Sequence, residues 1–153
     1  MKAKDFLKQV EKLDKLIENK MIEREHWKSI ALNVTSSGET VKINGVLHVQ
    51  DKVQSSGNPQ KMADAVAHYV DIEAEITECI DKFIDTKQDV ISVIEKLNAT
   101  EYDLMHKLYI QHMTMLDAAI ACEKTYSWAT TIHGRALKEV QKILDEREKK
   151  NEG

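Results

Sequence analysis

Helix-breaking and aromatic residues are scarce in this sequence. Its 153 residues include one proline and five glycines, and aromatic residues make up 5% of the chain. Because proline and glycine end or weaken helices, their scarcity favours long helices, and the few aromatic residues exclude a large aromatic core. Apolar residues reach 42% but form no run near the ~20 residues that a membrane span needs. We therefore expect an all-α protein without a membrane segment.

Cysteine is also scarce, and no pattern of a catalytic or metal site occurs. Cys79 and Cys122 occupy apolar helical positions, with no partner at metal-ligand or redox spacing. We expect both to be small core residues in a protein of the reducing cytoplasm, since the charged start of the chain does not resemble a signal peptide. No glycine-rich phosphate loop or nucleophile motif is present. The sequence predicts a protein that is not an enzyme and that holds no metal or cofactor.

Residues 1–97 have the apolar spacing of a coiled coil, interrupted by an insert at 33–59. Two long segments repeat apolar side chains at 4-3 spacing, so we predict an antiparallel coiled-coil helical hairpin. The repeating positions are Phe6, Val10, Leu13, Ile17, Arg24, Trp27 and Ala31, then Met62, Ala65, Tyr69, Ile72, Ile76, Cys79, Phe83 and Val90. Other apolar residues of the first segment fall off this seam, and a homodimer would cover them. They are Leu7, Leu16, Met21, Ile22, Ile30 and Leu32.

The insert has the composition of turns and short strands. Residues 41–49 alternate around Asn44-Gly45, which is the strongest short signal for a two-residue hairpin turn. We expect a small β-hairpin at the tip of the coiled coil, with a mobile loop as the alternative. Pro59 is expected in the first turn of the second long helix, where a proline costs no hydrogen bond.

Residues 98–153 are predicted to form three helices, the last two of which make a helix-turn-helix. Thr100 is expected to cap a supporting helix over residues 101–111, which buries Leu104, Met105 and Leu108. Thr114 precedes a short helix over 115–122. Glu123-Lys124 breaks the chain before Thr125, which is the expected cap of a longer helix starting at Tyr126.

The helix that starts at Tyr126 has two distinct faces. Ala129, Ile132, Ala136, Leu137 and Val140 recur at helical spacing and predict a buried face. No acidic residue stands between Glu123 and Glu139, and in a helix-turn-helix the second helix enters the major groove. We predict that the outward side chains bind DNA: Tyr126, Ser127, Thr130, Thr131, Arg135 and Lys138. For Gly134 in this helix we favour close packing over a close approach to a ligand, and Trp128 either packs beneath the helix or projects toward DNA.

Three stretches of the chain resemble one protein family. They are the string His133-Gly134-Arg135-Ala136-Leu137-Lys138 and the segments 53–59 and 61–66. Together with the helix-turn-helix pattern, they resemble the regulators similar to sigma factor region 4 that occur in phages and prophages of Gram-positive bacteria, including autolysin regulators. The resemblance implies transcriptional control, with double-stranded DNA as a partner and RNA polymerase as a further candidate partner.

The sequence departs from that family's pattern at the turn and at the reading positions. Glu123 stands where glycine is usual, and Ala118 stands where isoleucine is usual. The residues at the base-reading positions carry hydroxyl groups, which discriminate bases less well than arginine or glutamine does.

The charge balance is the weakest match to a nucleic-acid partner. The formal net charge is −4, with the acidic excess in residues 61–97 and no strongly basic region, so phosphate contacts should give modest affinity. The leading hypothesis is a DNA-binding transcriptional regulator of phage or prophage type. Two alternatives remain open: a packaging protein similar to a small terminase, and a modulator that binds RNA polymerase without affinity for DNA.

Overall fold

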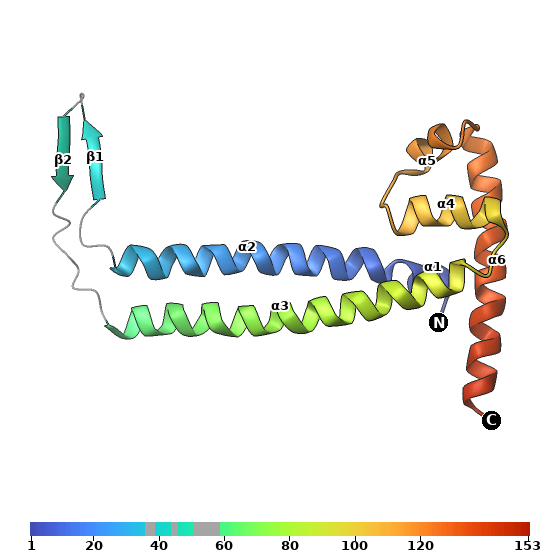
Figure 1. Cartoon of the computed structure of the whole chain (residues 1–153), viewed down its shortest axis with the longest axis horizontal. Coiled ribbons are helices and arrows are strands. Elements are labelled where there is room, and N and C mark those ends of the chain that lie inside the picture. The colour runs from blue at the N-terminus through green and yellow to red at the C-terminus, as the bar shows by residue number, and fades with distance from the viewer. Residues whose placement is uncertain (36–38, 44–45, 51–58) are drawn as a thin grey trace. The chain divides into compact units, whose positions relative to one another are not determined.

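The chain is predominantly helical, as the sequence predicts. The computed structural model describes residues 1–35, 39–43, 46–50 and 59–153, with side chains described for 1–32 and 59–153. The helices are α1 (Ala3–Leu7), α2 (Gln9–Thr35), α3 (Pro59–Ile94), α4 (Ala99–Tyr109), α5 (Met115–Ala121) and α6 (Tyr126–Asn151) (Figure 1). Pro59 is the first residue of α3, as expected. None of the helices within the described residues has the length and apolar character needed to cross a membrane.

Packing divides the chain into two compact units. Unit 1 consists of residues 1–16 and 80–153, and unit 2 consists of residues 17–79. This division differs from the predicted boundary at residue 97. The reason is that the last turns of α3 bury Val93 and Ile94 in the same core as Met105 of α4, so they pack as part of the C-terminal unit.

In unit 1, α1, α4 and α5 all lie against α6 (Figure 1). The larger core of this unit consists of Ala3, Phe6, Leu7, Val10, Val90, Val93, Ile94, Met105, Tyr109, Ala136, Val140 and Leu144. Leu7 is completely buried here, so the prediction that it would be available to a second chain is wrong. A smaller core beneath the helix-turn-helix consists of Leu104, Ala118, Ala119 and Ala129. Its three alanines allow α5 and α6 to approach closely.

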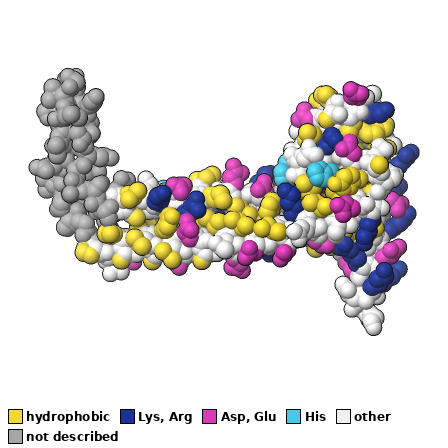
Figure 2. All heavy atoms as spheres, viewed as in Figure 1, with side chains coloured by type: hydrophobic (Ala, Val, Ile, Leu, Met, Phe, Trp, Pro, Cys, Tyr) yellow, Lys and Arg dark blue, Asp and Glu magenta, His cyan; other side chains and the backbone are white. Residues whose placement is uncertain are grey.

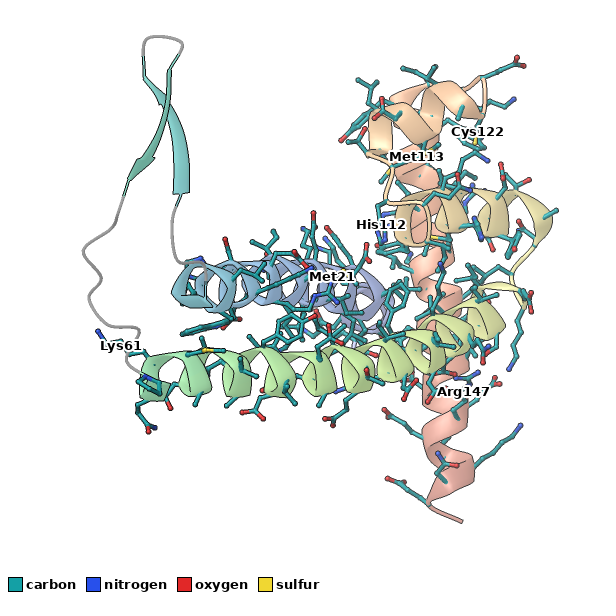
Figure 3. All side chains as sticks on the ribbon, turned by 60° about the vertical axis from the view of Figure 1, so that its left-hand side comes forward. Met21, Lys61, His112, Met113, Cys122 and Arg147 are labelled. Atoms are coloured by element: carbon teal, nitrogen blue, oxygen red, sulfur yellow. The ribbon has the colours of Figure 1, made fainter. Side chains whose placement is uncertain are left out.

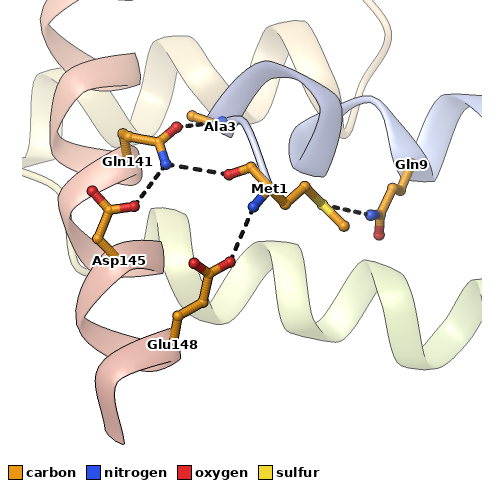
Figure 4. A network of polar contacts seen from close by, with 6 residues as sticks. All are labelled: Met1, Ala3, Gln9, Gln141, Asp145 and Glu148. Atoms are coloured by element: carbon orange, nitrogen blue, oxygen red, sulfur yellow. Dashed lines mark hydrogen bonds and ion pairs between the residues drawn. The ribbon is translucent and has the colours of Figure 1, made fainter. Parts of the chain in front are cut away.

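Polar contacts tie the start of the chain to the second half of α6 (Figure 4). The Ala3 amide donates to Gln141 Oε1 at 2.8 Å, and Gln141 Nε2 donates to the Met1 carbonyl at 3.2 Å and to Asp145 Oδ1 at 2.9 Å. The Met1 amine lies 3.0 Å from a carboxylate oxygen of Glu148. One glutamine thus satisfies backbone groups at the start of α1, where a helix has unpaired amides.

The first helix, predicted as continuous, is interrupted at Lys8 between α1 and α2.

In unit 2, α2 and α3 run antiparallel. Arg24 Nη1 lies 3.2 Å from Glu73 Oε1, and Lys20 pairs with Glu75. One turn further along α2, the ring of Trp27 stacks on that of His68 with centroids 4.4 Å apart. The residue numbers of these contacting pairs fall along α3 as they rise along α2, so the two helices run in opposite directions. The buried apolar residues of this unit lie on the predicted 4-3 seam: Ile17, Ala65, Ile72 and Ile76.

Unit 2 also contains two strands, β1 (Glu39–Ile43) and β2 (Val46–Gln50), which pair antiparallel with Val41 opposite His48. These strands flank the predicted turn at Asn44-Gly45. The turn itself and the segments that connect the strands to α2 and α3 lie outside the described residues. A β-hairpin at the tip of a coiled coil therefore stays a prediction.

The boundaries of α4 and α5 differ from the predicted ones. The cap of α4 is Asn98, whose side-chain oxygen accepts the Glu101 amide at 2.9 Å, so the prediction of Thr100 is wrong. The chain turns tightly after α3, where the Leu97 amide bonds to the Ile94 carbonyl at 3.0 Å, and this turn brings Asn98 to the capping position. Cys122 lies just after α5, which ends at Ala121.

Candidate nucleic-acid interface

Hydroxyl caps fix the starts of both helices of the helix-turn-helix. Thr114 Oγ1 accepts the Asp117 amide and Thr125 Oγ1 accepts the Trp128 amide, each at 3.1 Å. Both caps were predicted from the sequence and are confirmed. Because each cap satisfies an amide that lacks a helical partner, it sets the residue at which α5 or α6 begins and therefore which side chains face outward.

The turn between α5 and α6 has a left-handed residue at Glu123, with φ of 56°. The Lys124 amide donates to the Ala119 carbonyl at 2.9 Å, which closes the end of α5. Glycine adopts this backbone conformation most easily, and the predicted resemblance implied glycine at this turn. The departure at Glu123 thus keeps the backbone conformation that glycine favours, with some strain.

The two predicted faces of α6 are correct. Ala129, Ala136 and Val140 are completely buried, and Ile132 and Leu137 are partly buried. All the side chains predicted to contact DNA are exposed: Tyr126, Ser127, Thr130, Thr131, Arg135 and Lys138. The helix therefore presents one continuous outward face that starts at its N-terminus.

The hydroxyl groups on this face are not equivalent. Thr130 Oγ1 and Thr131 Oγ1 both donate to the Ser127 carbonyl at 2.9 Å. Their hydrogens are therefore used within the helix, and only their acceptor lone pairs remain for a partner. The Ser127 hydroxyl has no such bond among the described residues. Sequence reasoning missed this difference, although serine and threonine in helices commonly bond back to a preceding carbonyl.

Two of the cations of α6 are available to an anion. Arg135 and Lys138 make no ion pair within the described part of the chain. By contrast, Lys142 Nζ lies 2.6 Å from Glu139 Oε1, and Arg147 donates to Asp89 at 2.8 Å. The hydrogen bond with Glu139 raises the pKa of Lys142. Figure 2 shows Lys and Arg side chains gathered along α6 with acidic ones among them, so the cationic part of the outward face is short.

Gly134 lies on the outward face between Thr130 and Lys138. A Cβ atom built on Gly134 meets no atom within 4 Å. The prediction that this glycine allows close packing inside the protein is therefore wrong. Glycine in a helix costs ~1 kcal/mol relative to alanine, and no contact within the described residues accounts for that cost.

A half-buried layer supports the outward face from below. Trp128 packs against the small core beneath the helix-turn-helix, and Lys124 Nζ lies 6.0 Å from the centroid of the Trp128 ring. The Tyr109 hydroxyl lies 2.8 Å from Nε2 of His133, joining α4 to α6. Burial raises the pKa of Tyr109 to about 12 and lowers that of His133. The pair is therefore neutral near pH 7, and the tautomer of His133 decides which of the two groups donates the hydrogen bond.

The outward face of α5 has a different character. Leu116 and Ile120 are 54% and 65% exposed, and α5 contains no lysine or arginine. The first helix of a helix-turn-helix normally crosses the phosphate backbone, where cations are favoured. This apolar surface on α5, which the sequence analysis did not identify, fits protein better than phosphate.

Other groups near the interface have structural roles. Figure 3 shows His112 and Met113 in the connection from α4 to α5, and Cys122 beside α5. The Cys122 thiol donates to Asp103 Oδ2 at 3.5 Å, and burial raises its pKa, which lowers its reactivity. Within the described residues, no group of three or more His, Cys, Asp or Glu side chains could hold a metal ion.

Comparisons with known proteins give no match. No family model, no curated protein and no solved structure is similar to this chain.

Proposed function

We propose that this protein is a DNA-binding transcriptional regulator that reads duplex DNA with the N-terminal half of α6. The single observation that carries the proposal is the continuous outward face of α6. It has no acidic residue between Glu123 and Glu139, it starts at a capped helix end, and its two cations lack intramolecular ion pairs. The more specific proposal, that the regulator is of phage or prophage type, rests on the sequence resemblance alone.

The residues of this face divide into two roles. Tyr126, Ser127, Thr130 and Thr131 occupy the first two turns, which contact base edges when the second helix of the motif lies in the major groove. Arg135 and Lys138 lie further along the helix, where phosphates are the closer partners. The modest number of cations predicts weak binding that depends strongly on sequence-specific contacts.

A second candidate function is supported by α5. Its exposed Leu116 and Ile120, beside Asp117 and without a cation, favour a protein partner at the position where phosphate would otherwise lie. This arrangement suits a modulator that binds RNA polymerase and has no DNA affinity. The alternative of a packaging protein similar to a small terminase gains no specific support from the described residues.

For α2 and α3 we propose a coiled-coil hairpin that serves dimerisation or partner binding. Leu16, Met21, Ile22 and Leu32 are exposed on α2, and a second copy of the chain would cover them. Analytical ultracentrifugation at tens of micromolar tests this assembly, and a purely monomeric protein would contradict it.

The proposed DNA contact is tested by titrating fluorescent duplex fragments of the encoding genome at several salt concentrations. Arg135→Ala and Lys138→Ala should weaken binding to all fragments and should each reduce the slope of log K against log salt by roughly one unit. Lys150→Ala, near the end of the same helix, is the matched control and should leave the slope unchanged.

Two outcomes separate the candidate functions. Binding at low salt with the expected changes in slope supports DNA recognition by α6. If no fragment binds at low salt, DNA recognition fails. Capture of purified RNA polymerase that is lost in Ile120→Asp then supports the modulator.

A further inference from the structure

We infer that α6 recognises thymine through the γ-methyl groups of Thr130 and Thr131, so that its preferred sites contain A·T pairs at the positions these residues meet. The inference rests on the proposed binding of duplex DNA. It goes further, because it names the chemical group that is read and the side-chain atoms that read it.

The hydroxyl hydrogens of both threonines are already committed. Each donates to the Ser127 carbonyl at 2.9 Å, although both side chains are exposed. A hydroxyl held in this way cannot donate to a guanine or thymine acceptor without breaking its bond to the helix. Donor readout by these two residues is therefore disfavoured.

The same bonds fix which branch of each threonine remains for a partner. Threonine has few allowed side-chain rotamers in a helix, and here the hydroxyl branch is turned to the backbone. The methyl branch makes no polar contact and stays on an exposed side chain. In the major groove, the C5-methyl of thymine is the one apolar group on a base edge, and threonine methyl groups are among its usual partners.

Gly134 allows a base to come close enough to contact the short side chains of Thr130 and Thr131. It follows Thr130 by one helical turn and leaves open space above the helix backbone. Methyl groups interact only at direct contact, so a surface that reads them must lie close to the bases. The run of Thr130, Thr131 and Gly134 has no long side chain that would hold the bases away.

The test begins with a duplex selected from a random pool by the full-length protein, with affinity measured by fluorescence anisotropy. Thymines in the selected site are replaced one at a time by uracil, which lacks only the methyl group. We expect about a fourfold loss of affinity at each contacted thymine, the factor that corresponds to one buried methyl group. Replacement of thymines outside the site should change nothing.

Paired variants assign the effect to the methyl branch. Thr130→Val and Thr131→Val keep a methyl at that position and remove the hydroxyl, so the preference for thymine over uracil should persist. Thr130→Ser and Thr131→Ser keep the hydroxyl and remove the methyl, so the preference should disappear at the matching base. Circular dichroism melting of each variant checks that α6 remains folded.

The outcomes separate this inference from the proposed function. Tight binding with equal affinity for thymine and uracil overturns methyl recognition and leaves DNA binding intact. Loss of the preference in the valine variants instead of the serine variants overturns it too, in favour of hydroxyl readout. Absence of any DNA binding by the wild-type protein contradicts the proposed function itself.

Discussion

Units 1 and 2 are both built mainly from helices but differ in how completely they bury side chains. In unit 1, Leu104, Met105 and several valines have no exposed surface at all. In unit 2, Ala65 is 1% exposed, while Ile17, Ile72 and Ile76 retain 5–8% exposure. Two packed helices shield a seam less well than several helices around one centre. We conclude that the outward face of α6 rests on a fully buried core, while the seam of unit 2 is less completely buried.

The seam of unit 2 also contains a charged residue, Arg24. It occupies a position on the predicted apolar seam and pairs with Glu73. Its buried Nε atom lies 3.4 Å from Glu25 Oε1 but makes no hydrogen bond among the described residues. Glu73 also accepts a hydrogen bond from Tyr69, which raises the pKa of that phenol. A charged residue in a seam lowers stability but restricts the register of two helices. We interpret the cluster around Arg24 as a register device in unit 2.

The largest expected effect tests the core of unit 1. Leu104→Ala should lower the free energy of unfolding by about 2–5 kcal/mol, because it leaves a cavity between α4, α5 and α6. Urea unfolding followed by circular dichroism measures the loss. Leu116→Ala, on the exposed face of α5, is the matched control and should change stability by less than about 0.5 kcal/mol. Similar losses in both variants would contradict the core assigned here.

A somewhat smaller effect is expected in unit 2. Ile76→Lys should lower the free energy of unfolding by roughly 2–3 kcal/mol, because it replaces a buried apolar side chain with a charged one. The loss should not be larger, because the long lysine side chain can place its ammonium group in water beside the seam. Glu78→Lys introduces the same side chain at an exposed position and should lower the free energy of unfolding by less than about 0.5 kcal/mol. If the two variants unfold at the same urea concentration, the seam runs through other residues.

Gly134→Ala in unit 1 should change stability with the opposite sign. It should stabilise unit 1 by up to about 1 kcal/mol, since alanine is the better helix former and its Cβ meets nothing. If DNA approaches the helix backbone at this position, affinity should fall in the same variant. Thermal melting and DNA titration on one preparation separate the two effects. A loss of stability would show that the space at Gly134 is filled.

The smallest effect concerns pH and should be confined to unit 1. Burial lowers the pKa of His133, so the unfolded chain takes up a proton before the folded one. Stability contributed by the neutral imidazole is present above the unfolded pKa of about 6.5 and is lost as pH falls below it. His133→Gln keeps a hydrogen-bonding partner for the Tyr109 hydroxyl but does not titrate. Melting between about pH 8 and pH 5 should therefore show a weaker acid dependence in this variant.

The local features of α6 were predictable from the amino-acid sequence alone. The caps at Thr114 and Thr125 and the inward and outward positions of α6 were all correct. They follow from helical periodicity and from hydrogen bonds that reach three residues along the chain, so nothing distant is needed to predict them. The 4-3 seam at Ile72 and Ile76 was predictable for the same reason.

Which distant segments share a core, and which surfaces remain open, became clear from the packing of the helices. The burial of Leu7 and Ile94 in one core depends on segments that are far apart in the sequence. The choice of Asn98 over Thr100 as a cap depended on the turn that follows α3. Likewise, the open space at Gly134 is a matter of three-dimensional position, because burial is set by neighbours that a sequence pattern does not name.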